Sequence, residues 1–154
     1  MIIKFLLVFF ISTISYAQIT LNEMKTILNK DIDYIETFAL SRGYSFKEII
    51  KDDIEEGIGY VKGVGKETKH LAFYSSSNAN GGKVLFYQTG RETDYLLIKK
   101  QLIEQGFKLT ATYDNEGVLH KEYKNTLYKV RLRTGKADYP SLREFYTVEI
   151  LFNN

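Results

Sequence analysis

The sequence predicts an α+β fold, in which a tandem pair of helix-plus-antiparallel-strand units forms one sheet with helices packed on one face. Two observations predict it. Apolar residues at helical spacing end twice at a glycine followed by an aromatic residue, in SRGYSF (41–46) and EQGFKL (104–109). After each glycine come short runs of the alternating or β-branched and aromatic type that is typical of strands. Each half is too small to cover its own elements, so both are expected to share one core.

The first 17 residues have the features of a cleaved signal peptide. Lys4 precedes an apolar run, and Ser15 and Ala17 place small residues where a signal peptidase cuts. The alternative is a membrane anchor, but the apolar run is shorter than the roughly 20 residues that span a bilayer. We therefore expect residues 1–17 to be removed, no integral membrane segment after cleavage, and export to the periplasm or the exterior. Residues 18–154 are expected to form a single α+β domain.

Composition excludes several classes of protein. The formal net charge is +2, and it falls to +1 when Lys4 is removed, so nothing indicates a nucleic-acid partner. There is no cysteine. This excludes disulfide scaffolds, cysteine nucleophiles, cysteine zinc sites and iron–sulfur clusters. Stability must come from a hydrophobic core, which a chain of this length can bury.

Helix boundaries are marked by capping signals. Thr20 and Glu23 have the spacing of a capping box, and Asp31 is placed to begin a second helix that ends at Gly43. A second capping box is predicted over Thr89–Glu92, before a helix that ends at Gly106.

Strand signals fill the rest of the chain. Asparagine–glycine turns at 80–82 and 115–117 join neighbouring runs. The predicted strands cover 44–51, 58–64, 70–76, 83–89, 107–113, 118–124, 128–133 and 146–152.

Residues about 27–90 and 91–154 are interpreted as two αβββ repeats. At an offset of 63, core-type residues coincide: Ile35 with Ile98, Leu40 with Ile103, Tyr44 with Phe107, Phe46 with Leu109 and Tyr60 with Tyr123. The alternative is that any helix-to-strand junction favours glycine and then an aromatic residue. In architecture, such a pair of units resembles the beta-lactamase-inhibitor-protein type of fold, and no sequence motif adds to this resemblance.

No pattern indicates a catalytic residue, a metal site or a cofactor. His70 and His120 lie 50 residues apart, without the spacing of a metal site. An acidic run contains Asp52, Asp53, Glu55 and Glu56. Paired carboxylates serve glycosidases, but an acidic run before a strand is more often a solvated turn. We predict no catalytic residues.

Two features favour binding. Lys129, Arg131 and Arg133 form a basic stripe on one strand, and the alternative is that they pair across strands with Glu122 or Glu149. Tyr74 and Tyr87 are predicted to face away from Leu71, Phe73, Val84 and Phe86, as an exposed aromatic patch. The alternative is a sheet covered on both faces.

We therefore expect a small exported binding or interaction module without a cofactor. Its partner is expected to be a protein or an anionic component of the envelope, and the sequence identifies neither this partner nor the oligomeric state. One alternative is a cofactor-independent hydrolase acting on envelope or extracellular material, with the acidic run near a histidine. Another is a structural subunit of an envelope assembly.

Overall fold

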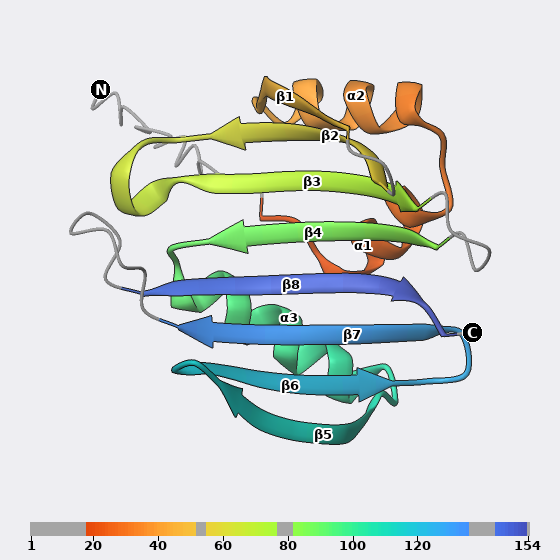
Figure 1. The fold of residues 1–154 in the computed structure, drawn as a ribbon, viewed down its shortest axis with the longest axis vertical. Coiled ribbons are helices and arrows are strands. Elements are labelled where there is room, and N and C mark those ends of the chain that lie inside the picture. Colours follow the sequence, from red (N-terminus) through yellow and green to blue (C-terminus); the bar gives the residue numbers. More distant parts are fainter. Residues whose placement is uncertain (1–17, 52–54, 77–81, 136–143, 154) are drawn as a thin grey trace, which may run out of the picture.

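The computed structural model describes residues 18–51, 55–76, 82–135 and 144–153. In these residues, three α-helices cover one face of a single eight-stranded antiparallel sheet (Figure 1). The predicted α+β class is confirmed. The predicted signal peptide, residues 1–17, lies outside the described residues.

The strand order across the sheet is β1-β2-β3-β4-β8-β7-β6-β5. The helices are α1 (Leu21–Leu28), α2 (Ile32–Ser41) and α3 (Glu92–Glu104), with a short 3-10 helix, η1 (Gly65–Glu67). The strands before α3 are β1 (Ser45–Lys51), β2 (Glu55–Lys62), β3 (Lys69–Ser76) and β4 (Lys83–Thr89). Those after it are β5 (Lys108–Asn115), β6 (Val118–Lys124), β7 (Tyr128–Gly135) and β8 (Phe145–Phe152).

Most of the predicted helix ends are confirmed. The Thr20 hydroxyl accepts a hydrogen bond from the Glu23 amide at 3.2 Å, and the Glu23 carboxylate accepts one from the Thr20 amide at 2.8 Å. Asp31 caps α2 by accepting from the Tyr34 amide. Gly43 and Gly106 both have φ = +75°, the left-handed conformation that glycine adopts without a Cβ clash.

The second predicted capping box, Thr89–Glu92, is wrong. Thr89 is the last residue of β4, and α3 begins at Glu92 after an N-cap, Arg91, whose side chain makes no capping bond. The Thr89 hydroxyl lies 3.3 Å from Asp94 Oδ2 and accepts from the Arg91 amide. The threonine is thus held in the strand by a buried carboxylate, and the helix starts two residues later than a capping box requires.

The eight predicted strands are all present, and four of them follow each of α2 and α3, one more than the αβββ description of each repeat names. The two edge strands, β1 and β5, coincide with the runs predicted at 44–51 and 107–113. β1 and β5 are each paired on one side only, and nearly all their residues are exposed. Each edge strand also carries a β-bulge, between Phe46 and Glu48 in β1 and between Leu109 and Ala111 in β5.

One hydrophobic core lies between the sheet and the helices. Helix α1 contributes its whole apolar face, and α1 and α3 both contact the central strands β4 and β8. The core-facing residues of the four central strands are Leu71, Phe73, Leu85, Tyr87, Val130, Leu132, Val148 and Ile150.

A buried ion pair fixes α3 against the sheet. Lys69 of β3 and Asp94 of α3 lie 2.6 Å apart (Nζ to Oδ2), with 5% and 3% of their surfaces exposed. The Tyr87 hydroxyl also donates to Asp94, at 3.0 Å. Burial raises the pKa of Tyr87, and the nearby Tyr44 and Asp94 raise it further, so the hydroxyl stays a donor. A charge removed from water needs such partners, so this cluster determines where α3 sits.

Candidate functional site

No described helix covers the face of the sheet opposite α1, α2 and α3, and we call it the open face (Figure 1). Alternate residues of every strand point to it. One row of cross-strand neighbours runs over this face and takes one residue from each of six strands. In the order β2, β3, β4, β8, β7 and β6, these residues are Gly59, Ala72, Phe86, Glu149, Arg131 and Glu122. Its β1–β4 part is mainly apolar, and its β6–β8 part is ionic.

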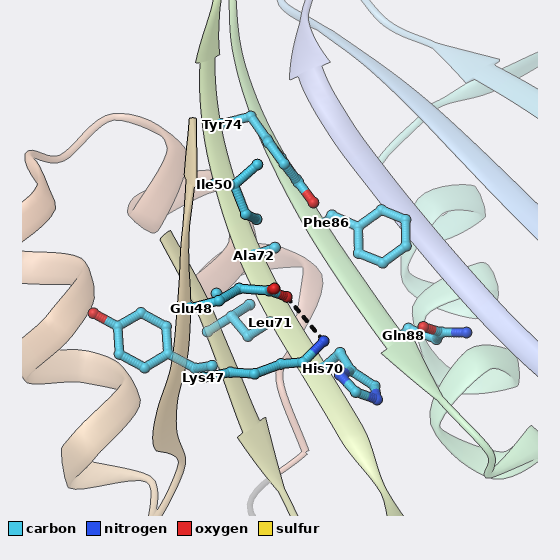
Figure 2. Close-up of a pocket in the computed structure, with 11 residues that line it drawn as sticks. Lys47, Glu48, Ile50, His70, Leu71, Ala72, Tyr74, Phe86 and Gln88 are labelled. Atoms are coloured by element: carbon cyan, nitrogen blue, oxygen red, sulfur yellow. Dashed lines mark ion pairs between the residues drawn. The ribbon is translucent and has the colours of Figure 1, made fainter. Parts of the chain in front are cut away.

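A hollow of about 150 Å³ lies in the apolar part (Figure 2). Ala72 and Gly59 line it where the side chains are small, and Ile50, Tyr74 and Phe86 line it with apolar groups. Tyr74 and Phe86 are half-buried. The hollow therefore offers ring and aliphatic surface to solvent in a recess that a protruding group can enter.

Two glycines of β2 explain the recess. Gly57 pairs with Tyr74, and a Cβ on Gly57 would lie 2.4 Å from the Phe73 carbonyl oxygen and 3.1 Å from Cδ1 of Tyr74. The strand can approach β3 so closely only because that Cβ is missing. A Cβ on Gly59 would meet Glu48 Cγ at 3.4 Å, which is ordinary contact. Gly57 thus allows the close approach of β2 to β3, and Gly59 allows Glu48 of β1 to pack over β2 at the rim of the hollow.

Polar groups surround the hollow. Lys47 and Glu48 form an ion pair of 2.8 Å (Nζ to Oε1), and His70 and Gln88 lie beside it (Figure 2). Burial lowers the pKa of His70 and the positive charge of Lys47 lowers it further, against an opposing effect of Glu48. His70 is therefore neutral at pH 7, with one donor and one acceptor nitrogen available for hydrogen bonds.

The ionic part of the open face is a ladder of alternating charges, which we call the ionic ladder. Lys129 Nζ lies 2.9 Å from Glu122 Oε2, and Arg131 lies 2.9 Å from Glu122 and 2.8 Å from Glu149. Arg133 also pairs with Glu149. Burial alone would raise the pKa of Glu122, but hydrogen bonds from Lys129 and Arg131 outweigh it and lower that pKa.

The predicted basic stripe therefore lies where expected, on one face of β7, and its three side chains make the cross-strand pairs that were the alternative. The prediction that Tyr87 shares an exposed face with Tyr74 is wrong. Tyr87 is fully buried, because the β3–β4 register places it opposite Leu71 on the helix side. Tyr74 instead shares the open face with Val84 and Phe86.

The acidic run and the histidines do not converge in the described residues. Asp52 and Asp53 lie outside the described residues, as does the Glu55 side chain. Glu56 is exposed and pairs with Ser75 on the helix side of the sheet, whereas His70 points to the open face. His120 stacks on Tyr113 with 4.8 Å between ring centroids. No group of His, Asp or Glu side chains in the described chain is arranged to hold a metal ion.

Sequence reasoning missed Phe86, Ala72 and the two glycines of β2 as parts of a candidate site. The sequence signal for them is two glycines, Gly57 and Gly59, in one strand and the small Ala72 in the next. The register of β2 and β3 places Gly59 opposite Ala72. Among the described residues, no helix is long and apolar enough to cross a membrane.

No protein-family model matches the chain, and neither a curated protein nor a solved structure is significantly similar to it. The resemblance in architecture to the beta-lactamase-inhibitor-protein type of fold thus remains a prediction.

Proposed function

We propose that the protein is an exported binding module that uses the open face of its sheet to bind a protein partner. The observation that carries this proposal is the hollow on β1–β4, where half-buried aromatic rings stand around small residues on a face that no described helix covers. Aromatic side chains beside a recess are typical of the anchors that dominate protein interfaces.

The ionic ladder supports the same use. Its five side chains are held by one or two ion pairs each, so less rotamer freedom remains to be lost when a partner covers them. A flat ladder of fixed charges next to a recess gives a surface that favours one orientation of a partner over others.

Position-specific photo-crosslinking in the producing cell tests this proposal. A crosslinking amino acid is placed at Gln88 or Ala111 on the open face and, as matched controls, at Glu36 or Lys100 on exposed helix positions. We expect one defined crosslinked protein from the open-face positions and none from the helix positions. The additional substitution Tyr74→Ser should remove the crosslink made through Gln88, because it removes a wall of the hollow.

Equal crosslinking from both faces, or a crosslink at Gln88 that survives Tyr74→Ser in a folded protein, would contradict the proposal. Export is tested in the same cells by measuring whether the mature protein begins at Gln18 and leaves the cytoplasm.

We also propose that the two halves are repeats. The β1–β2 and β5–β6 hairpins support this, because every pair of one register maps onto the other at an offset of 63, bulge included. Burial agrees as well: Tyr60 and Tyr123 are both buried, while Phe46 and Leu109 are both 53% exposed. If they are repeats, Gly43→Ala and Gly106→Ala should destabilise the fold equally, by about 1 kcal/mol each. A difference above about 1 kcal/mol in urea unfolding would speak against equivalence.

A further inference from the structure

We infer that the partner presents an acidic segment with one aromatic or large aliphatic side chain, which enters the hollow while its carboxylates meet lysines of β5–β7. This inference rests on the proposed function, and it adds the chemistry of the segment that is bound.

The size of the hollow sets the kind of group that enters it. A cavity of about 150 Å³ lined by apolar side chains holds one benzene-sized molecule. The hollow has this volume, and Ile50, Ala72, Tyr74 and Phe86 supply its apolar lining. It therefore accepts one ring or one branched aliphatic side chain rather than a length of backbone.

The polar groups beside the hollow complement the backbone that carries such a side chain. Gln88 has an amide donor and an acceptor, and neutral His70 has one of each. The Lys47–Glu48 pair stands at the β1 side. A partner loop whose side chain enters the hollow would bring its own amide and carbonyl groups within reach of these residues.

Charge on the open face selects an acidic segment. Lys108, Lys124 and Lys129 lie directly beside one another across β5, β6 and β7, and we call them the lysine row. Lys129 pairs with Glu122, whereas no carboxylate of the described residues forms an ion pair with Lys108 or Lys124. The lysine row thus carries positive charge that the described chain does not neutralise, and negative side chains of a partner would complement it.

The spacing between the two parts limits the segment. The hollow is lined by residues of β1 to β4, so its middle lies over β2 and β3, and the lysine row begins at β7, about 14–19 Å away at about 4.8 Å per strand. An extended chain advances about 3.3 Å per residue. The acidic residues should therefore follow or precede the aromatic residue by about four to six positions.

Peptide fluorescence tests the inference directly. The protein has no tryptophan, so the emission of a tryptophan-containing peptide reports only on the peptide. The probe is Gly-Trp-Gly-Ser-Gly-Asp-Glu-Asp, blocked at both ends. One control peptide has lysines in place of the acidic residues. A second has alanine in place of tryptophan and serves as a competitor. We expect saturable binding and a blue shift for the probe alone, and no displacement by the alanine peptide at equal concentration.

Two pairs of variants locate the binding. Ala72→Leu fills the hollow, and Ala111→Leu adds the same side chain to the same face at β5. We expect Ala72→Leu to weaken probe binding at least about tenfold, since burial of one large apolar side chain contributes that much or more. Ala111→Leu should change it less than about twofold. If Ala72→Leu does not fold, Phe86→Ala takes its place, because it removes a wall of the hollow.

The second pair of variants tests the charges of the lysine row. It compares the double variant Lys108→Gln/Lys124→Gln with Lys99→Gln/Lys100→Gln on α3, which has the same net charge. The first should weaken binding about two- to tenfold at low salt and the control should not. Equal binding of the lysine peptide, no saturable binding at millimolar probe, or no effect of the filled hollow would overturn the inference. Binding to anionic phospholipid vesicles that Ala72→Leu leaves unchanged would also overturn it. In each case, a crosslinked protein at Gln88 would still support the proposed function.

Discussion

Phe86 of β4 and Glu149 of β8 lie directly opposite each other on the open face. They mark the line where the apolar hollow ends and the ionic ladder begins. Glu149 is 7% exposed although it faces away from the core, because it is surrounded by Arg131, Arg133 and the adjacent strand. An aromatic and a charged side chain are thus direct cross-strand neighbours on the same face.

The first prediction concerns this carboxylate. Glu149→Gln keeps the shape of the side chain but removes the charge that holds Arg131 and Arg133. We expect the free energy of unfolding to fall by about 1–3 kcal/mol at low salt, measured by urea titration, because hydrogen bonds to charged groups contribute on this scale. Glu56→Gln, at an exposed and distant ion pair, should change it by less than about 0.5 kcal/mol. Equal effects of the two variants would contradict a structural role of the ladder.

The buried pair beneath α3 gives the second prediction. Lys69→Met leaves Asp94 buried without its ammonium partner, which should cost about 3–5 kcal/mol of unfolding free energy. Lys100→Met breaks an exposed pair with Glu104 on the solvent side of α3 and should cost less than about 0.5 kcal/mol. Urea denaturation followed by circular dichroism measures both. A Lys69→Met protein as stable as Lys100→Met would show that Asp94 does not depend on the lysine.

The pH dependence of stability gives the third prediction. The pKa of His70 is lowered in the folded protein, so the unfolded chain binds the proton first as the pH falls below about 6.5. The free energy of unfolding should therefore decrease from about pH 7.5 to about pH 5.5, with respect to a His70→Gln variant. His120→Gln, which keeps His70, should retain the slope. The prediction is contradicted if the free energy of unfolding of the wild-type protein increases relative to His70→Gln as the pH falls over this range.

The fourth prediction separates the two glycines of β2. Gly57→Ala places a Cβ 2.4 Å from a backbone oxygen of β3, which cannot move without displacing the strand. It should destabilise the protein by about 1–3 kcal/mol. Gly59→Ala meets the Glu48 side chain at 3.4 Å and its backbone oxygen at 3.7 Å, without a clash, and should change stability by less than about 1 kcal/mol. Thermal unfolding of the two single variants compares them under identical conditions, and equal losses would contradict this view of β2.

Much of the fold could be predicted because local signals determine it. The capping box at Thr20, the cap at Asp31 and the glycines 43 and 106 each satisfy a backbone requirement that involves only neighbouring residues. The open face could be predicted only in part. In β4, Val84, Leu85, Phe86 and Tyr87 are all apolar or aromatic, so alternation alone does not say which side faces the helices. The pairing with β3 and β8 decides it, and that pairing is not local.

The ionic ladder illustrates the opposite case. Three alternating basic residues on β7 predicted both a stripe and its neutralisation by Glu122 and Glu149, since charges on one face of a sheet favour opposite charges across strands. The hollow was not predictable in this way. It depends on two small residues, Gly59 and Ala72, that only the non-local register of β2 and β3 places opposite each other.

The pairing of β4 with β8 is the strand contact that joins the part of the described sheet before α3 to the part after it. Along the chain, the segment that contains α3 connects these two parts of the sheet. We expect that the β4–β8 pairing can also form between two molecules. In that case β4 of each chain pairs with β8 of the other. Such an exchange would build an intertwined dimer from contacts already present in the monomer. Refolding at high protein concentration, followed by gel filtration, is the condition under which this exchanged form should accumulate.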